Sequence, residues 1–322
     1  MSEVLGISIS TVSRALKDHP DISEKTKQKV KELAAALEYE PNTYAVQLRT
    51  QQSSLLGILV PSIDNFFYDS FIAAVEEEAR THGYSVMIMQ SRDNVQTETA
   101  NLQLFKRSMI TGLFISISVE TEDMSLLRKI EDKKVPVIFF DRVVDGDEYH
   151  KVCLEDTKAA RIAAEALIAA GKKNILALFG HPHLSISQER CQSFKETFRQ
   201  QAPDTNLTIE YPENSARSEK MALQALTGEN RPDAIFCMGD LILIGVMYAV
   251  HKMNVRIPYD MGIISISNGL IPTLYNPKIT YVETSGYKLG KLAFHQMRQR
   301  LNGGENPGRV DVESVLVKGG SL

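Results

Sequence analysis

Apolar positions recur at helical spacing twice near the N-terminus of this chain. The first run is Ile9, Val12 and Leu16, and Ser8 before it is a residue type that caps helices. Residues 21–23 open a second run, whose apolar positions are Val30, Leu33, Ala34 and Leu37 and whose outer positions are Lys25, Lys27, Lys29 and Lys31. Two short helices joined by a turn predict a helix-turn-helix unit.

From residue 55 onward, short apolar runs alternate with amphipathic helices. The runs of strand character are 55–61, 84–90, 112–117, 135–141, 150–155, 174–180, 233–239 and 261–267. Near-continuous apolar strands with helical crossovers predict an α/β body of parallel sheets covered on both faces. Gly83 and Gly171 follow two of the helices, as C-terminal caps do. About ten strands predict two such sheets, with a boundary near 149–154.

Length and composition limit the classes of protein that remain. A chain of 322 residues with 43% hydrophobic residues has room for a small domain and a two-lobed body. It opens without a signal peptide, and no apolar run approaches the roughly 18 residues of a membrane span, so we expect a cytoplasmic protein with no membrane contact. Cys153, Cys191 and Cys237 lie far apart without a CxxC pair, which suits a reducing compartment and predicts neither a metal nor a cofactor.

One face of the first helix has the composition of a DNA-contacting surface. Ser10, Thr11, Ser13, Arg14 and Lys17 place short hydroxyls and two cations where phosphate oxygens and purine edges could be met. A solvated amphipathic helix explains the same residues equally well. The net charge gives no support for DNA binding, because the first 52 residues hold seven Lys plus Arg against seven Asp plus Glu and the whole chain carries −4.

Polar side chains follow the predicted strands. Ligands of open α/β sheets bind outside the carboxyl ends of the strands. The residues there are Asp64, Asn65, Phe66, Phe67, Asp141, Arg142, His181, His183, Asp240, Ser267 and Asn268, and Arg190 lies in the helix after the histidines. Aromatic faces, carboxylates, an amide and guanidinium groups around one cleft can enclose a small polar molecule.

These residues also have ordinary structural explanations. Phe66 or Phe67 could be a core residue, and Phe67 is our choice for stacking on a ligand. The aspartates could cap helices or anchor loops, and the arginines could pair with surface carboxylates. The pair His181 and His183 lacks an acidic or thiol partner at metal-site spacing, which favours a plain loop. The motifs GxSxG, GxxxxGK[ST], HExxH and GxGxxG are absent, so we do not expect an enzyme.

The motifs TVSRAL at 11–16, Pro41-Asn42 and FFDR at 139–142 resemble the lactose-repressor and galactose-repressor (LacI/GalR) family of bacterial transcription regulators. The resemblance runs from Gly6 nearly to the C-terminus. It implies a ligand-responsive regulator, usually a repressor, that binds a near-palindromic DNA operator as a homodimer and a small sugar-like or purine effector between two lobes of periplasmic-binding-protein type. The alternative is a small-molecule sensor without functional DNA binding.

The resemblance also implies a division of the chain. The helix-turn-helix headpiece spans 1–41 and the hinge helix and linker 42–53. The first lobe spans 54–152 plus about 284–311, and the second 153–283 plus about 312–322. Dimer contacts are expected on helices of the first lobe, 64–82 and 95–109. The family has a helix before Gly6, of which only 1–5 is present here; a start codon assigned too late explains this better than a trimmed product.

By matching position, the resemblance assigns roles to the headpiece residues. Ile9, Ser10 and Arg14 would face bases. Six residues would approach phosphates: Ser8, Thr11, Ser13, Ser23, Thr26 and Tyr39. In the hinge, which begins at Asn42, Leu48 would wedge into the minor groove with Ala45 and Arg49 beside it.

The family's effector positions match Phe67, Asp141, Arg142, Arg190 and Asp240. Ser267 departs from the pattern, because many members carry there an Asp that holds ligand hydroxyls, and Ser193 replaces a usual Gly. Because the two arginines are kept while one Asp is lost, the pattern favours an anionic effector such as a phosphorylated or acidic sugar. Asp141 and Asp240 remain able to bind a neutral sugar, so both classes stay open.

Overall fold

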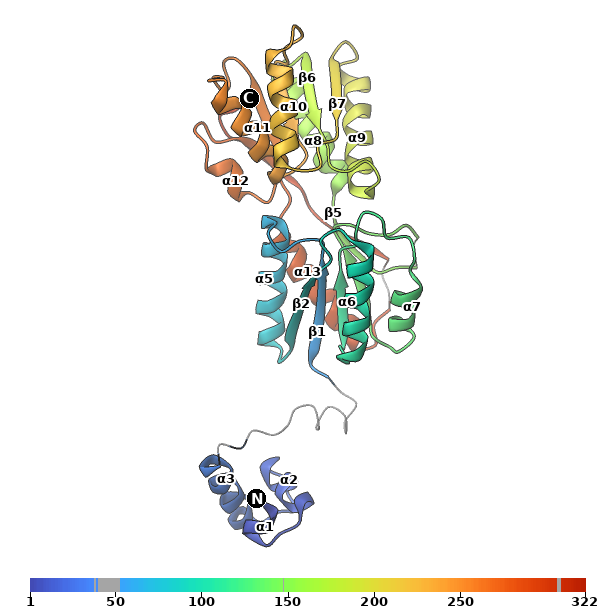
Figure 1. Cartoon of the computed structure of the whole chain (residues 1–322), viewed down its shortest axis with the longest axis vertical. Helices are drawn as coiled ribbons and strands as arrows, with labels where there is room; N and C mark the ends of the chain where they lie inside the picture. Colours follow the sequence, from blue (N-terminus) through green and yellow to red (C-terminus); the bar gives the residue numbers. More distant parts are fainter. Residues whose placement is uncertain (38, 40–52, 147, 306–307) are drawn as a thin grey trace. The chain divides into compact units, whose positions relative to one another are not determined.

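The computed structural model describes residues 1–37, 39, 53–146, 148–305 and 308–322, and it separates into two compact units, 1–53 and 54–322. In Figure 1 the first unit is blue and the second runs from light blue to red.

The first unit contains α1 (Ser2–Leu5), α2 (Ile9–Leu16) and α3 (Glu24–Ala36). Ser8 and Ser23 cap the second and third helices by accepting hydrogen bonds from the backbone N–H of Thr11 and Thr26, at 3.1 and 3.3 Å, so both predicted helix starts are confirmed. The buried core consists of Val12, Ala15 and Val30, with Met1, Leu5, Ile7, Leu16 and Ile22 packed partly against it.

Parts of the predicted helix faces are corrected. Ile9 is 78% exposed and Leu37 is 56% exposed, because three short helices leave the ends of these apolar faces without a neighbour among the described residues. Lys27, expected on the outside, is buried, and its ammonium donates to the Glu24 carboxylate at 2.7 Å.

The second unit has two lobes, each built on a six-stranded sheet. The first sheet has the order β11-β5-β4-β3-β1-β2 and the second β12-β10-β9-β8-β6-β7. All pairs are parallel except β10 with β12. The first lobe contains β1 (Leu55–Val60), α5 (Phe66–Thr81), β2 (Ser85–Gln90), α6 (Val95–Arg107), β3 (Gly112–Ile115), α7 (Ser125–Glu131), β4 (Val137–Phe140), β5 (Lys151–Leu154), α13 (Gly286–Leu301) and β11 (Arg309–Val312).

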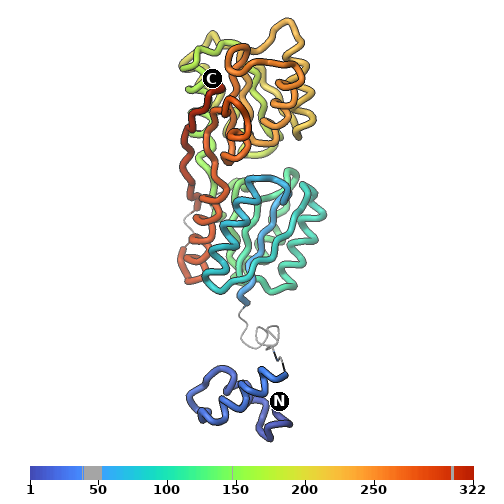
Figure 2. Tube along the Cα trace, turned by 90° about the vertical axis from the view of Figure 1, so that its left-hand side faces the viewer, coloured from blue at the N-terminus to red at the C-terminus, as the bar shows by residue number. Residues whose placement is uncertain are grey.

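The second lobe contains α8 (Asp156–Ala169), β6 (Asn174–Leu178), α9 (Ser185–Gln201), β7 (Asn206–Glu210), α10 (Ser215–Thr227), β8 (Ala234–Cys237), α11 (Asp240–Lys252), β9 (Gly262–Ser267), α12 (Leu270–Thr273), β10 (Thr280–Glu283) and β12 (Val315–Val317). The chain crosses between lobes after β5, β10 and β11, and Figure 2 shows its red C-terminal part in both. Strand β5 continues to Leu154, beyond the predicted end of the first-lobe segment at 152.

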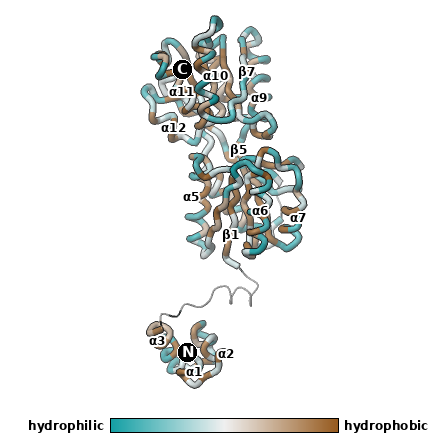
Figure 3. The backbone as a smooth tube through the Cα atoms, in the orientation of Figure 1, coloured by the Kyte–Doolittle hydropathy of each residue, from teal (hydrophilic) through white to brown (hydrophobic). Residues whose placement is uncertain are grey.

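The apolar strands lie between helices, as their composition predicts. Figure 3 shows hydrophobic positions along the strands of both lobes and hydrophilic ones on the outer turns. Gly83 and Gly171 adopt φ values of 77° and 69° just after α5 and α8, which confirms the predicted ends of these helices. No helix in the described part of the chain has the length and apolar character that crossing a membrane requires.

Candidate functional site

A cavity of about 420 Å³ lies where the carboxyl ends of strands from both sheets meet. All six residues chosen from the sequence as effector contacts line it: Phe67, Asp141, Arg142, Arg190, Asp240 and Ser267. Asn65, His181 and Asn268 from the wider list of post-strand residues line it too. Phe66 instead packs against the core of the second lobe, as its structural explanation allowed.

Asp141 is held in place by a tyrosine that the sequence did not single out. The Tyr68 hydroxyl donates to Asp141 Oδ2 at 2.6 Å and also lies 3.0 Å from Ser116 Oγ. Asp141 has a φ of 57°, in the left-handed region, and burial raises the pKa of its carboxyl group. Tyr68 is 2% exposed and lies on the buried face of α5, so nothing in the sequence pattern distinguishes it from a core residue.

Both arginines of the cavity already have carboxylate partners. Arg142 Nη1 donates to Asp93 Oδ1. Arg190, 5% exposed, places Nε and Nη2 at 2.8 and 2.6 Å from Asp156 Oδ1 and donates from Nη1 to the Met238 carbonyl at 3.0 Å. Burial raises the pKa of Asp156 to about 6. Arg142 therefore pairs with an exposed carboxylate, as the predicted alternative described, whereas the partner of Arg190 is a buried carboxylate and not a surface one.

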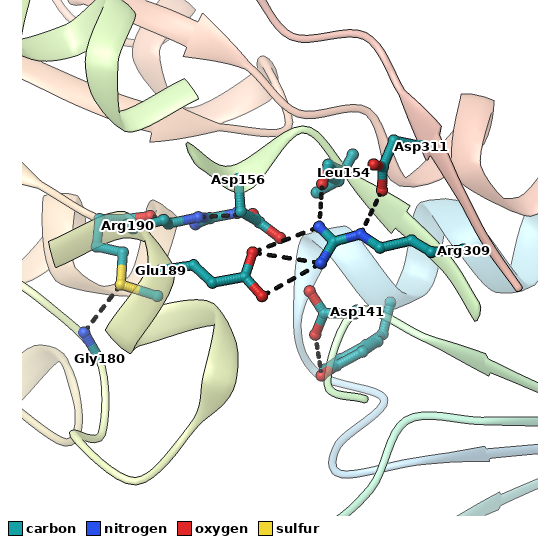
Figure 4. A network of polar contacts seen from close by, with 10 residues as sticks. Asp141, Leu154, Asp156, Gly180, Glu189, Arg190, Arg309 and Asp311 are labelled. Atoms are coloured by element: carbon teal, nitrogen blue, oxygen red, sulfur yellow. Dashed lines mark hydrogen bonds and ion pairs between the residues drawn. The ribbon is translucent and has the colours of Figure 1, made fainter. Parts of the chain in front are cut away.

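A contact between lobes lies beside the second pair. Arg309 of β11 donates from Nη1 to Glu189 Oε1 at 3.2 Å, and Glu189 belongs to α9 of the other lobe. Figure 4 shows these two side chains facing each other next to Arg190 and Asp156. Arg309 is fixed further by Asp311, 2.8 Å from its Nε.

Asp240 and Ser267 form the opposite part of the lining. Ser267 Oγ donates to Asp240 Oδ1, and the backbone N–H of Asn268 donates to Asp240 Oδ2 at 3.2 Å. Burial raises the pKa of the Asp240 carboxyl group. Asp240 begins α11, so it is anchored by the loop after β9 while its carboxylate reaches the cavity.

The residues proposed to touch DNA lie on the first unit. Ser8, Ser10, Arg14 and Ser23 are exposed, Thr11, Ser13 and Thr26 are half-buried, and Ile9 and Tyr39 are 78% and 46% exposed. Neither Arg14 nor Lys17 forms an ion pair with another described residue. The Ser8 hydroxyl lies 2.7 Å from Ser10 Oγ and 2.8 Å from Thr11 Oγ1, so these hydroxyls share one small surface. The hinge residues Asn42, Ala45, Leu48 and Arg49 lie outside the described residues.

A metal site finds no support in the described part of the chain. No group of three His, Cys, Asp or Glu side chains there is arranged to hold an ion. His181 lines the cavity, and its ring meets that of His183 edge-on at 5.2 Å.

A helix-turn-helix unit followed by two parallel-sheet lobes around a polar cavity defines a ligand-responsive DNA-binding regulator. The model of the bacterial regulatory proteins of the lacI family matches residues 4–42, and that of the periplasmic binding proteins and sugar binding domain of LacI family matches residues 53–317. The chain belongs to the LacI family of bacterial regulatory proteins. Members of this family are transcription regulators.

Individual relatives cover nearly the whole chain. The transcriptional regulator DegA of Bacillus subtilis (strain 168) is 25% identical over 320 residues, which are 98% of this chain and 93% of DegA. The ribose operon repressor of Halalkalibacterium halodurans is 27% identical, covering 89% of this chain and 85% of its own. The structure of the Lac repressor dimer bound to operator and the anti-inducer ONPF superimposes with a TM-score of 0.87 at 23% identity, over 99% and 97% of the two chains, and shows the same fold.

Proposed function

We propose that this protein is a transcription repressor that binds a near-palindromic operator as a dimer and responds to a small neutral polyhydroxylated effector. The observation that carries the effector part is the cavity, which gathers six residues chosen from the sequence into one lining. Its volume suits a sugar-sized molecule. We infer that the cavity binds this molecule without converting it, and that the protein acts in the cytoplasm, where bacterial DNA lies.

The first unit supports the DNA-binding part of the proposal. Its recognition helix would be α2, which presents Ile9, Ser10 and Arg14 to solvent. Apolar side chains can contact thymine methyl groups, and arginine can bind guanine with two hydrogen bonds. Because the first 52 residues are electrically balanced, binding must depend on these local contacts and on two copies acting together.

Selection of DNA from a random duplex library by the full chain tests this part. We expect a pseudo-palindrome whose half-sites are about one helical turn apart, enriched at both low and high salt. Failure to enrich any sequence, with the protein folded and dimeric, would leave the small-molecule sensor as the better description.

The charge of the cavity favours a neutral effector over an anionic one. The anionic expectation rested on two arginines and on Ser267 in place of an Asp, but Arg142 is paired with Asp93 and Arg190 with Asp156. The lining contains five carboxylates against these two arginines: Asp93, Glu120, Asp141, Glu213 and Asp240. Carboxylates accept hydrogen bonds from sugar hydroxyls and repel a phosphate. Phe67 offers an apolar face for stacking.

Matched pairs of sugars test the effector class. Thermal unfolding would be followed with D-ribose, D-xylose and D-glucose and with their phosphate esters, each pair at equal concentration. A neutral sugar present at about 100 times its Kd should add about 2.7 kcal/mol of stability, while its ester adds less. Greater stabilisation by the phosphate ester than by its neutral sugar contradicts a neutral effector. If no sugar or ester stabilises the protein, these sugars are not its effectors.

Exposed apolar side chains support the dimer. On α11 and after α12 of the second lobe, Leu241, Tyr248 and Leu274 are 41%, 62% and 67% exposed. On the first lobe, Ile88 of β2 and Leu104 of α6 are 43% and 39% exposed. Tyr248→Glu should therefore shift sedimentation of the full chain from dimer toward monomer. An unchanged dimer would place the interface elsewhere.

A further inference from the structure

One side chain spans the gap between the lobes with three hydrogen bonds. Asn268 follows β9 of the second lobe. Its Nδ2 donates to the Phe66 carbonyl at 3.2 Å and to Ser70 Oγ at 2.7 Å, and its Oδ1 accepts from the Gly286 N–H at 2.9 Å. Both α5 and α13, which hold these partners, belong to the first lobe.

One of these bonds satisfies a group that a helix cannot satisfy itself. Gly286 is the first residue of α13, so its N–H has no acceptor within the helix. Ser285 caps a different N–H, that of Lys288, at 3.2 Å. Asn268 therefore caps a helix of the opposite lobe from outside. Two donors on one side and one acceptor on the other fix the orientation of its amide group.

The place where Asn268 meets the first lobe is closely packed. A Cβ atom at Gly286 would overlap the carbonyl oxygen of Phe67, and one at Gly290 would lie 2.6 Å from the Phe71 carbonyl oxygen. The first turns of α5 and α13 therefore touch through their backbones, with little room to adjust separately. A displacement of Asn268 must move both helices or break its hydrogen bonds.

The backbone of the same residue is tied to the cavity. The backbone N–H of Asn268 donates to Asp240 Oδ2, and the other oxygen of the same carboxylate, Oδ1, accepts from Ser267 Oγ. Asp240, Ser267 and Asn268 all line the cavity, and so does Phe67 on the first-lobe side. A molecule that competes for the Asp240 oxygens acts directly on the loop that positions Asn268.

We propose that Asn268 is the positioning residue that couples the Asp240–Ser267 side of the cavity to α5 and α13 of the first lobe. The inference rests on the proposed function only in taking this cavity as the effector site. An effector that hydrogen-bonds Asp240 would shift the Asn268 backbone, and the side chain would pass that shift to the first turns of the two helices. Aspartate at this position would keep the acceptor for Gly286 but lose both donors.

Hydrogen exchange of the full chain, without DNA or any small molecule, tests the coupling. The readout is the amide exchange rate of residues 285–289 at the start of α13. Asn268→Ala should speed it about three- to tenfold, because the cap of Gly286 is lost, and Asn268→Asp should leave it near the wild-type rate. Asp240→Asn should also speed exchange there, although it lies in the other lobe.

The decisive comparison combines two changes. In the Asn268→Ala background, Asp240→Asn should add nothing further at 285–289, because the connection is already cut. An equal effect of Asp240→Asn in both backgrounds, or an unchanged rate in Asn268→Ala, overturns the proposal. Ser70→Ala, which removes one partner and leaves Asn268 in place, should give a smaller increase and decides the matter if Asn268→Ala does not fold. Because this assay uses neither DNA nor an effector, its result does not depend on the DNA-selection and sugar-binding experiments that test the proposed function.

Discussion

The buried pair of Arg190 and Asp156 allows a quantitative prediction for the variant Arg190→Met. The two side chains are 6% and 4% exposed, and all three guanidinium nitrogens of Arg190 are engaged. Methionine fills similar space but leaves the Asp156 carboxylate buried without a cation. Breaking a buried pair from one side costs about 3–5 kcal/mol, whereas a surface pair contributes at most about 1 kcal/mol.

Urea unfolding measures this cost. The chain has no Trp, so the main transition is best followed by far-UV circular dichroism. The matched control is the double variant Asp156→Asn with Arg190→Met, which removes both charges and should recover most of the loss.

The pH dependence gives a second check. Burial already raises the pKa of Asp156 to about 6 in the native state, above its ordinary 3.8, so the folded protein binds this proton more tightly than the unfolded chain. Stability from this group is therefore present at low pH and lost as pH rises through about 6. Arg190→Met should raise that pKa further and cost more at pH 8 than at pH 5.

A loss below about 1 kcal/mol, or a double variant as unstable as the sum of the two singles, refutes the reasoning. It would mean that water reaches the pair and that Arg190 can turn to a ligand. The case for an anionic effector would then return.

Three further predictions test other parts of the molecule. His150 is buried near a guanidinium and its pKa falls to about 4 from 6.5, so the stability it supports at neutral pH should fall by up to about 3 kcal/mol as pH drops from 7 to 4, and His150→Asn should lose this part of the pH dependence of unfolding. Gly286→Ala should lower the free energy of unfolding by about 1–3 kcal/mol through overpacking against α5, whereas Gly239→Ala, with open space around the added Cβ, should cost clearly less. Arg14→Ala should weaken binding to the selected duplex by roughly fivefold to more than a hundredfold and relax selection at one base pair, whereas Lys17→Ala should weaken all duplexes alike.

Most strands inside the two sheets were predictable, as was the edge strand β2, whereas the inner strand β10 and the edge strands β7, β11 and β12 were not. The central strands β1, β3, β4, β8 and β9 are continuous apolar runs, which the sequence shows directly. The edge strands β7 and β11 alternate exposed and half-buried positions over four or five residues. Such short polar segments have the composition of loops. They form strands because they pair with one neighbouring strand, and composition does not reveal that pairing.

Because β7 was not predicted, one residue of the cavity lining was not predicted either. Glu213 lines the cavity from the loop after β7, and a residue cannot be identified as following a strand that was not recognised. Asp93 was within reach of the same rule, since it follows β2. Tyr68 was not, because its hydroxyl points to Asp141 from a helical position that is otherwise apolar.

The effector's charge class depends on pairings that sequence spacing does not reveal. Arg142 and Asp93 lie 49 positions apart and Arg190 and Asp156 lie 34 apart, so only the folded sheets bring them together. The structure also changes the interpretation of Ser267, because its hydrogen-bond partner is distant in the sequence. As a lost carboxylate it suggested an anionic ligand, yet its hydroxyl donates to the half-buried Asp240, where a second carboxylate would repel the first. A serine there stabilises one ionised carboxylate rather than creating a site for an anion, and the two paired arginines independently support the proposal of a neutral effector.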